Sequence, residues 1–188
     1  MRDRAATRRR ILDAAYALFY RHGYARVGVD AVAAKAGITQ RTLYDHFRSK
    51  DELLAAVFEL HHELALRQIE RWGARATGKV SQMIDTIFAD LARWAATPRW
   101  AGAGFTRLVM ELADLPGHPA RAIARRHKAT VEAWLAQEFA KRRVKKAEQR
   151  AREIVLLLEG TTALMLVHAD RSYAAAAAEA AKRLLDRA

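Results

Sequence analysis

The sequence contains no cysteine, and it has only three prolines and nine glycines among its 188 residues. Without cysteine there is no disulfide framework, no thiolate metal site and no thiol nucleophile. The most apolar stretch, residues 154–169, is interrupted by Glu159 and is shorter than the ~18 residues that a membrane span needs. The charged opening, Met1-Arg2-Asp3-Arg4, has no apolar stretch behind it, so we expect no signal peptide. We therefore expect a soluble, cytoplasmic protein that does not enter a membrane.

Positive charge exceeds negative charge, and the excess is concentrated near the N-terminus. The whole sequence has 33 Lys and Arg against 21 Asp and Glu, a formal net charge of +12. Residues 1–50 alone hold eleven basic and four acidic residues, a balance of +7. A basic segment of this kind predicts an anionic polymer such as nucleic acid as a partner. Taken alone, it would equally suit a membrane surface or a solvated face with no partner.

Apolar residues recur at three- and four-residue spacing along the chain, which is typical of amphipathic helices. One such helical face consists of Ile11, Ala14, Ala15, Leu18 and Phe19. Glycine accepts the left-handed conformation that ends helices, so Gly23 is expected to end this one. No alternating strand pattern and no internal repeat is present in the sequence. We predict an all-α fold of about nine helices, with a division of the chain inside a long helix near residues 49–73.

Residues 29–47 have the pattern of two short helices that meet near a right angle. A small residue, Ala33, stands where the helices would touch, and Gly37 follows four positions later for the sharp turn. Thr39 is suited to cap the second helix. The apolar residues that would lock the two helices together are Val32, Ile38, Leu43 and Phe47. This is the pattern of a helix-turn-helix, whose second helix enters the DNA major groove by its N-terminus.

Together with its flanks, this motif resembles the TetR family, the tetracycline-repressor-like transcriptional regulators. Residues 36–54 read Ala-Gly-Ile-Thr-Gln-Arg-Thr-Leu-Tyr-Asp-His-Phe-Arg-Ser-Lys-Asp-Glu-Leu-Leu, and Gly23-Tyr24 precedes the motif. The resemblance is specific over residues 8–60 and elsewhere rests on length, helix count and an apolar penultimate helix. It implies a three-helix DNA-binding domain over residues 1–50. The remainder, residues 51–188, would be a helical bundle for ligand binding and dimerisation.

One departure from the family pattern lies before the second helix. Val27-Gly28-Val29 stands where such proteins often have a Ser or Thr that touches a phosphate.

The second motif helix is expected to face DNA on the side opposite Leu43 and Phe47, which would point inward. Gln40 suits an adenine edge and Arg41 a guanine edge, and each good bidentate pair gives ~1–3 kcal/mol of discrimination. Lys50 adds charge beside a helix N-terminus that already favours anions. The resemblance implies phosphate contacts from Thr39, Thr42, Tyr44 and His46.

Some of these basic residues have simpler interpretations. Arg41 could pair with Asp45 on the same helix face for ~0.2–0.5 kcal/mol, although the surrounding motif favours base readout. His46 could pack beside Phe47. The run Arg8-Arg9-Arg10 suits either a basic arm on the DNA backbone or minor groove or a solvated helix face.

A ligand pocket is harder to derive from the residues. The aromatic side chains of Phe88, Phe105 and Trp134 are candidates to line it, although each alone is more commonly a core residue. Glu159 and Thr162 lie in an otherwise apolar run, where an acid must find a partner or change its ionisation. Glu159 would either orient a polar or cationic ligand or pair with an arginine.

The last two helices are expected to form a homodimer interface. Operators read by helix-turn-helix proteins are usually two-fold symmetric, with half-sites ~34–36 Å apart, so the protein should be a dimer. Residues 154–169 have more apolar surface than one bundle face needs, and the alanine-rich segment 172–181 lets backbones approach closely. The alternative is that the alanine-rich helix covers its own protomer.

These observations predict a ligand-responsive dimeric repressor that binds a palindromic DNA operator, with an unidentified small-molecule effector and no cofactor. One alternative is a helical-bundle metal enzyme, since Glu59-Leu60-His61-His62 contains a Glu-x-x-His. Di-iron bundles need two such copies and two further glutamates, and the sequence has no second copy, so we expect neither a metal nor an enzymatic activity. Another alternative is a DNA-binding nucleoid or division factor without an effector.

Overall fold

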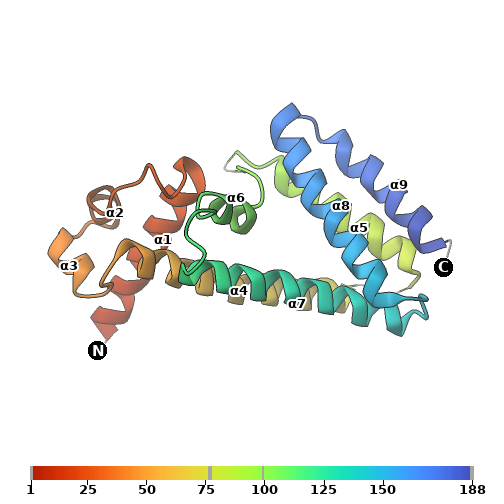
Figure 1. The fold of residues 1–188 in the computed structure, drawn as a ribbon, viewed down its shortest axis with the longest axis horizontal. Helices are drawn as coiled ribbons and strands as arrows, with labels where there is room; N and C mark the ends of the chain where they lie inside the picture. Colours follow the sequence, from red (N-terminus) through yellow and green to blue (C-terminus); the bar gives the residue numbers. More distant parts are fainter. Residues whose placement is uncertain (1, 76–77, 99, 187–188) are drawn as a thin grey trace. The chain divides into compact units, whose positions relative to one another are not determined.

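The structure is a computed structural model that describes residues 2–75, 78–98 and 100–186. Within these residues it contains nine α-helices and no strand, so the all-α prediction is confirmed (Figure 1). The helices are α1 (Arg2–His22), α2 (Val29–Ala36), α3 (Gln40–Tyr44), α4 (Lys50–Arg75), α5 (Val80–Ala95), α6 (Gly104–Met110), α7 (Pro119–Lys141), α8 (Ala147–His168) and α9 (Ser172–Asp186). None of the described helices is both long enough and apolar enough to cross a membrane.

The helices assemble into two compact units, and two long helices take part in both. The first unit holds the chain up to residue 64 together with residues 104–126. The second holds residues 65–103 and 127–188. The divisions therefore fall inside α4 and inside α7. The predicted boundary at residue 50 separates a DNA-binding domain from a domain for ligand binding and dimerisation. How the helices pack does not test such a boundary, so it stays a prediction.

The core of the first unit forms where the apolar faces of α1, α2, α3 and the start of α4 meet. Side chains that are almost fully enclosed there are Ile11, Ala15, Phe19, Val32, Leu43, Phe47, Leu53, Leu54 and Phe58. Their three- and four-residue spacing within α1 and α4 places them on one face of each helix. From much later in the chain, α6 and the following turn complete this core with Leu108 and Leu112.

Two side chains of α6 and the turn after it hold the connection between α1 and α2. Gly23 follows α1 with a φ of 88°, and a Cβ at this glycine would lie 2.7 Å from Oε1 of Glu111. Glu111 accepts a hydrogen bond from the backbone N–H of Ala25 at 2.9 Å. Arg107 donates to the carbonyl oxygen of Tyr20 at 2.6 Å, so a cation meets the C-terminal end of α1. The orientation of the chain entering α2 therefore depends on α6.

The second unit is built from α5, the later part of α7, α8 and α9. Its enclosed apolar side chains include Met83, Ile84, Ile87, Phe88, Leu135, Phe139 and Ile154. The alanine-rich α9 buries Ala177, Ala178 and Ala181, whose small size lets α9 lie against α5 and α8 (Figure 1). One face of the alanine-rich helix is therefore buried within the same chain.

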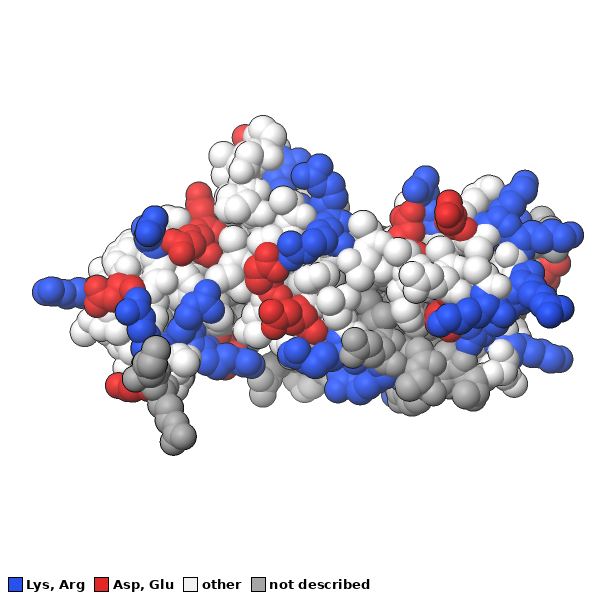
Figure 2. All heavy atoms as spheres, turned by 90° about the horizontal axis from the view of Figure 1, so that it is seen from below, with Lys and Arg blue, Asp and Glu red and all other residues white. Residues whose placement is uncertain are grey.

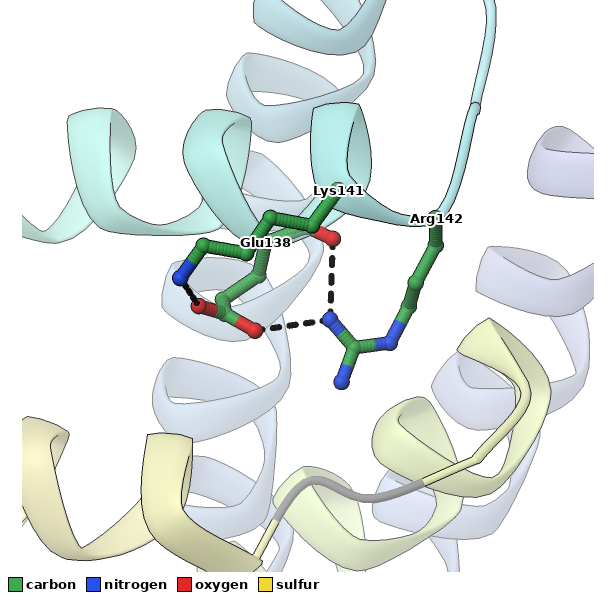
Figure 3. A network of polar contacts seen from close by, with 3 residues as sticks. All are labelled: Glu138, Lys141 and Arg142. Atoms are coloured by element: carbon green, nitrogen blue, oxygen red, sulfur yellow. Dashed lines mark hydrogen bonds and ion pairs between the residues drawn. The ribbon is translucent and has the colours of Figure 1, made fainter.

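A buried acid fixes the end of α7 (Figure 3). The Glu138 carboxylate accepts hydrogen bonds from Nζ of Lys141 at 2.6 Å and from Nη1 of Arg142 at 2.7 Å. Arg142 Nη1 also donates to the Glu138 carbonyl oxygen at 2.9 Å, which satisfies a helix-terminal acceptor. Burial by itself would raise the pKa of Glu138, but the two cations lower it overall. The acid therefore stays charged where the chain turns toward α8.

A partly buried histidine joins α1 to α4 inside the first unit. The rings of Tyr16 and His61 are stacked, with centroids 3.5 Å apart. Burial lowers the pKa of His61 from 6.5 to about 4, with a smaller opposing effect from Asp13. The unfolded chain therefore takes up this proton below about pH 6.5, whereas the folded protein does so only near pH 4. The stabilising contribution of neutral His61 is complete above pH 6.5 and decreases as the pH falls through this window.

We predict that the free energy of unfolding decreases when the pH is lowered from 7 to 5. We expect a smaller decrease in the His61→Phe variant. The substitution keeps an aromatic ring against Tyr16 but removes the titrating group, so the difference between the two proteins should be on the order of 1–2 kcal/mol. Urea unfolding at both pH values measures it. An equal loss in the two proteins would show that His61 does not carry this pH dependence.

Candidate nucleic-acid interface

The turn between α2 and α3 is closed by a left-handed glycine. Gly37 has a φ of 66°, and its N–H donates to the carbonyl of Ala34 at 3.1 Å while the N–H of Ile38 donates to that of Ala33 at 3.1 Å. These paired bonds end α2 and turn the chain sharply. Ala33 is buried at the helix contact, as a small residue there requires. The helix-turn-helix geometry predicted from this spacing is confirmed.

The short helix α3 is held by its cap and by its buried side. Thr39 is the N-cap, and its Oγ1 accepts a hydrogen bond from the backbone N–H of Thr42 at 3.1 Å. Leu43 and Phe47 are 0% and 1% exposed. A helix of five residues has little stability of its own. Its rotation about its axis is therefore set by these two buried side chains.

The face of α3 that remains in solvent carries the two residues predicted to read bases and one predicted to contact a phosphate. Gln40, Arg41 and Tyr44 are exposed, Tyr44 by 48% although it is a large aromatic residue. Among the described residues, no ion pair joins Arg41 to Asp45. This face therefore presents an amide, a guanidinium and a phenol side by side.

The other predicted contacts lie on the cap and on the segment that follows α3. Thr39 is exposed, and Thr42, His46 and Lys50 are partly buried. The hydroxyl oxygens of Thr39 and Thr42 lie 2.9 Å apart, within hydrogen-bond distance. The structure thus brings all seven predicted residues onto α3, its cap, the following turn and the first residue of α4. Their contacts with DNA stay predictions.

The N-terminus of α4 follows directly on this segment. The Ser49 hydroxyl accepts a hydrogen bond from the backbone N–H of Glu52 at 3.0 Å, and the Glu52 carboxylate accepts one from Arg48 N–H at 2.8 Å. The Lys50 ammonium lies 4.2 Å from the ring centroid of Tyr24. Burial lowers the pKa of Lys50, against smaller opposing effects from Asp51 and Glu111. The N-terminus of α4 is therefore capped, and its first residue, Lys50, places a positive charge close to the end of α3 in the sequence.

The basic residues of α1 have different partners from one another. The Arg8 guanidinium lies 4.9 Å from the centroid of the Phe47 ring, and Arg9 donates to Asp13 at 2.9 Å. Arg10 is exposed. Arg4, which the sequence did not single out, donates to the carbonyl oxygen of Asp45 at 3.3 Å. Arg4 and Arg8 thus contact the segment that ends α3, a role that neither of the two predicted interpretations included.

The five residues predicted for a ligand pocket are divided between the two units. Phe105 belongs to the first unit, where its ring meets Phe58 edge-on with centroids 4.8 Å apart. Phe88, Trp134, Glu159 and Thr162 belong to the second, and Phe88 is only 1% exposed in its core.

The polar members of this set have partners inside the second unit. Glu159 on α8 forms an ion pair with Lys128 on α7, so a lysine is one partner of its carboxylate. The Thr162 hydroxyl donates to the carbonyl oxygen of Leu158 at 2.7 Å. A groove of about 730 Å³ lies between the end of α7 and the start of α8. Its lining, which includes Gln137, Lys146 and Gln149, contains none of the predicted ligand residues. A role for those residues in ligand binding stays a prediction.

The Glu-x-x-His segment of α4 is used in packing and ion pairing. Glu59 forms an ion pair with Arg126, His61 stacks on Tyr16, and His62 is buried. In the part of the chain that the structure describes, no group of three or more His, Asp or Glu side chains is placed to hold a metal ion.

Basic side chains are distributed over the surface of both units. Figure 2 shows one face on which Lys and Arg outnumber Asp and Glu, with acidic side chains lying between the basic ones. The excess follows from the net charge of +12. The face of α3 is therefore distinguished by its geometry and not by charge alone.

Comparison with known proteins identifies the same region. Residues 11–57 match the model of a family described as bacterial regulatory proteins, tetR family. The chain is 43% identical over 58 residues to the HTH-type transcriptional repressor SCO4008 of Streptomyces coelicolor, an alignment that covers 31% of this chain and 30% of that protein. It is 40% identical over 97 residues to the HTH-type transcriptional regulator TtgR of Pseudomonas putida, covering 50% of this chain and 46% of TtgR. Each alignment thus spans less than half of the relative's own length.

The fold is similar over nearly the whole chain. The crystal structure of SCO4454, a TetR-family transcriptional regulator from Streptomyces coelicolor, superposes with a TM-score of 0.86. The match covers 97% of this chain and 96% of that one at 22% sequence identity. At this identity the comparison shows a shared fold.

We predict that Arg8→Ala lowers the free energy of unfolding by about 0.5–1 kcal/mol, because the cation–π contact with Phe47 is lost. Arg10→Ala is the matched control: it removes the same charge from another exposed position of α1 and should change stability less. Urea unfolding at neutral pH measures both. Equal effects would show that the contact with Phe47 contributes nothing.

Proposed function

Because this chain belongs to the tetR family of bacterial regulatory proteins, we propose that it is a DNA-binding transcriptional regulator that acts as a ligand-responsive, dimeric repressor. Members of this family are regulators of transcription and not enzymes. A protein with this role acts on chromosomal DNA in the cytoplasm.

The observation that carries the proposal is the orientation of α3. Burial of Leu43 and Phe47 turns Gln40 and Arg41 into solvent near the N-terminus of the helix, which is the end that enters a major groove. A glutamine amide matches the donor and acceptor of an adenine edge, and a guanidinium matches the two acceptors of guanine. We propose that these two side chains read bases.

We propose that the backbone contacts come from the residues around that helix. Thr39, Thr42, Tyr44, His46 and Lys50 would contact phosphates on either side of the groove. Hydroxyl, phenol, imidazole and ammonium groups all donate hydrogen bonds to phosphate oxygens. These contacts would hold α3 in register without reading sequence.

We propose that two protomers associate through α8 and α9. The outer face of α8 carries exposed apolar side chains one or two turns apart: Leu156 is 67% exposed, Leu164 41% and Val167 74%. Gly160 lies in the same stripe, and no described atom comes within 4 Å of a Cβ built there, which leaves room for a partner helix. The buried alanines of α9 are not available for this contact, so its outer residues Ala175 and Ala176 would take part.

We propose that the effector binds in the second unit. Glu159, Thr162, Phe88 and Trp134 all lie there, and the ion pair between Glu159 and Lys128 joins α8 to α7. A polar ligand that replaced Lys128 as the partner of Glu159 would change how these two helices are held together. Such a ligand shifts the equilibrium between a DNA-binding and a non-binding conformation only to the extent that its affinity for the two conformations differs. The name of the relative SCO4008 supports repression as the sign of control.

We predict that the protein retards DNA fragments from the flanks of its own gene in a mobility-shift assay, and that Arg41→Ala weakens this binding. Loss of one bidentate base contact costs about 1–3 kcal/mol and should relax the preference at a single position of each half-site. Arg143→Ala, which removes an exposed arginine of the second unit, is the control of equal charge.

Two outcomes would contradict this assignment. The first is equal binding by wild type and Arg41→Ala to every variant of the bound fragment. The second is failure of the wild type to bind any two-fold symmetric sequence in the flanking DNA.

A further inference from the structure

A buried histidine stands where the chain enters α7. The His118 side chain is 2% exposed, and its Nδ1 accepts a hydrogen bond from the backbone N–H of Ala120 at 3.1 Å. A ring nitrogen that accepts in this way holds no proton, so the proton of the neutral ring is on Nε2. Nε2 has no hydrogen-bond partner among the described residues and lies 3.5 Å from Oδ1 of Asp51 on α4. The buried N–H therefore faces a carboxylate just beyond hydrogen-bond distance.

The same carboxylate is held by a tyrosine from the turn after α1. The Tyr24 hydroxyl donates a hydrogen bond to Oδ1 of Asp51. Burial, assisted by Asp51, raises the pKa of Tyr24, so the phenol keeps its proton. The Tyr24 ring also meets the His118 ring edge-on, with centroids 5.9 Å apart. The Asp51 carboxylate is therefore hydrogen-bonded by Tyr24 and faced by His118 Nε2, although its side chain is 55% exposed.

Lys50, the first residue of α4, lies next to these side chains. The Lys50 ammonium lies 4.2 Å from the centroid of the Tyr24 ring. Lysine has a flexible stem, and part of its rotamer entropy is lost when the ammonium is fixed on a ligand. A ring that already supports the ammonium lowers that loss. Asp51, its neighbour in sequence, already acts on this ammonium by its charge, and it would pair with the ammonium directly, in competition with a phosphate, if its carboxylate were not held elsewhere.

We propose that His118, Asp51 and Tyr24 are positioning residues that hold Lys50 ready for a DNA phosphate. The residue just before α7 thereby affects how strongly the first residue of α4 binds DNA. None of the three residues needs to touch DNA: Tyr24 supports the ammonium, and His118 and Tyr24 together keep the Asp51 carboxylate from pairing with it. This inference rests on the proposed DNA-binding function. It adds to that site a residue from the loop before α7, far outside the segment that carries the helix-turn-helix.

The test is a double-mutant cycle in DNA binding, read as a function of salt concentration. Tyr24→Phe keeps the ring and removes the hydroxyl that holds Asp51. His118→Asn keeps an acceptor for the N–H of Ala120 and removes the group that faces Asp51. Each is made with lysine and with alanine at position 50, and Tyr16→Phe is the control for loss of a tyrosine hydroxyl in the same unit. The probe is a mixed-sequence DNA duplex, because a phosphate contact does not depend on base sequence.

We expect Lys50→Ala to lower the slope of log affinity against log salt by about 0.9 for each protomer bound. With Lys50 present, Tyr24→Phe and His118→Asn should each weaken binding about two- to fivefold, because the released Asp51 carboxylate would then pair with the ammonium in competition with the phosphate. In the Lys50→Ala background, neither should weaken it further. Tyr16→Phe should leave affinity and slope unchanged.

Three results would overturn the proposal. One is an unchanged affinity in both positioning variants while the wild type binds the duplex. Another is an equal loss with lysine and with alanine at position 50, which would place the effect in the fold or in a different contact. Failure of the wild type to bind the duplex would overturn the DNA-binding function itself, and this inference with it. Thermal unfolding of every variant checks the fold, and if His118→Asn is unfolded, Tyr24→Phe carries the test.

Discussion

Enclosure of Leu43 and Phe47 in the core of the first unit is the contact on which the candidate site depends. A five-residue helix has no stable orientation of its own, because it has too few internal hydrogen bonds to offset its nucleation cost. Burying these two side chains fixes the rotation of α3 about its axis. Since helical side chains repeat every 3.6 residues, fixing the inward face also determines that Gln40, Arg41 and Tyr44 face outward.

The elements that hold this contact come from before it and from well after it in the sequence. Arg4 and Arg8 on α1 contact the carbonyl of Asp45 and the ring of Phe47. From the other direction, Arg107 and Glu111 hold the turn after α1. The surface that we propose for DNA is therefore supported by α6 and by the start of α7 as well as by the helix-turn-helix. A change in the later helices has a physical route to that surface, because α4 and α7 each take part in both units.

Much of the first unit could be predicted because its determinants are local. Ala33 and Gly37 specify the turn, and Thr39 caps the helix that follows it, within a few residues of one another. The contact of Arg107 with Tyr20 spans 87 positions and that of Arg4 with Asp45 spans 41. No periodicity or spacing indicates such pairs, since they exist only after the helices have packed.

The second unit shows a different limit of sequence reasoning. The alanines of α9 suit any close helix contact, and only the folded chain shows that α5 and α8 cover Ala177, Ala178 and Ala181. Glu159 had to find a partner in an apolar run, but the pattern could not indicate that Lys128 would be that partner.

Sequence-specific DNA binding by α3 is tested most directly by selecting bound duplexes from a randomised DNA pool with the purified protein and sequencing them. We expect enrichment of a two-fold symmetric site whose half-sites lie about one helical turn, or a multiple of it, apart. Recovery of a pool no different from the starting one would contradict it.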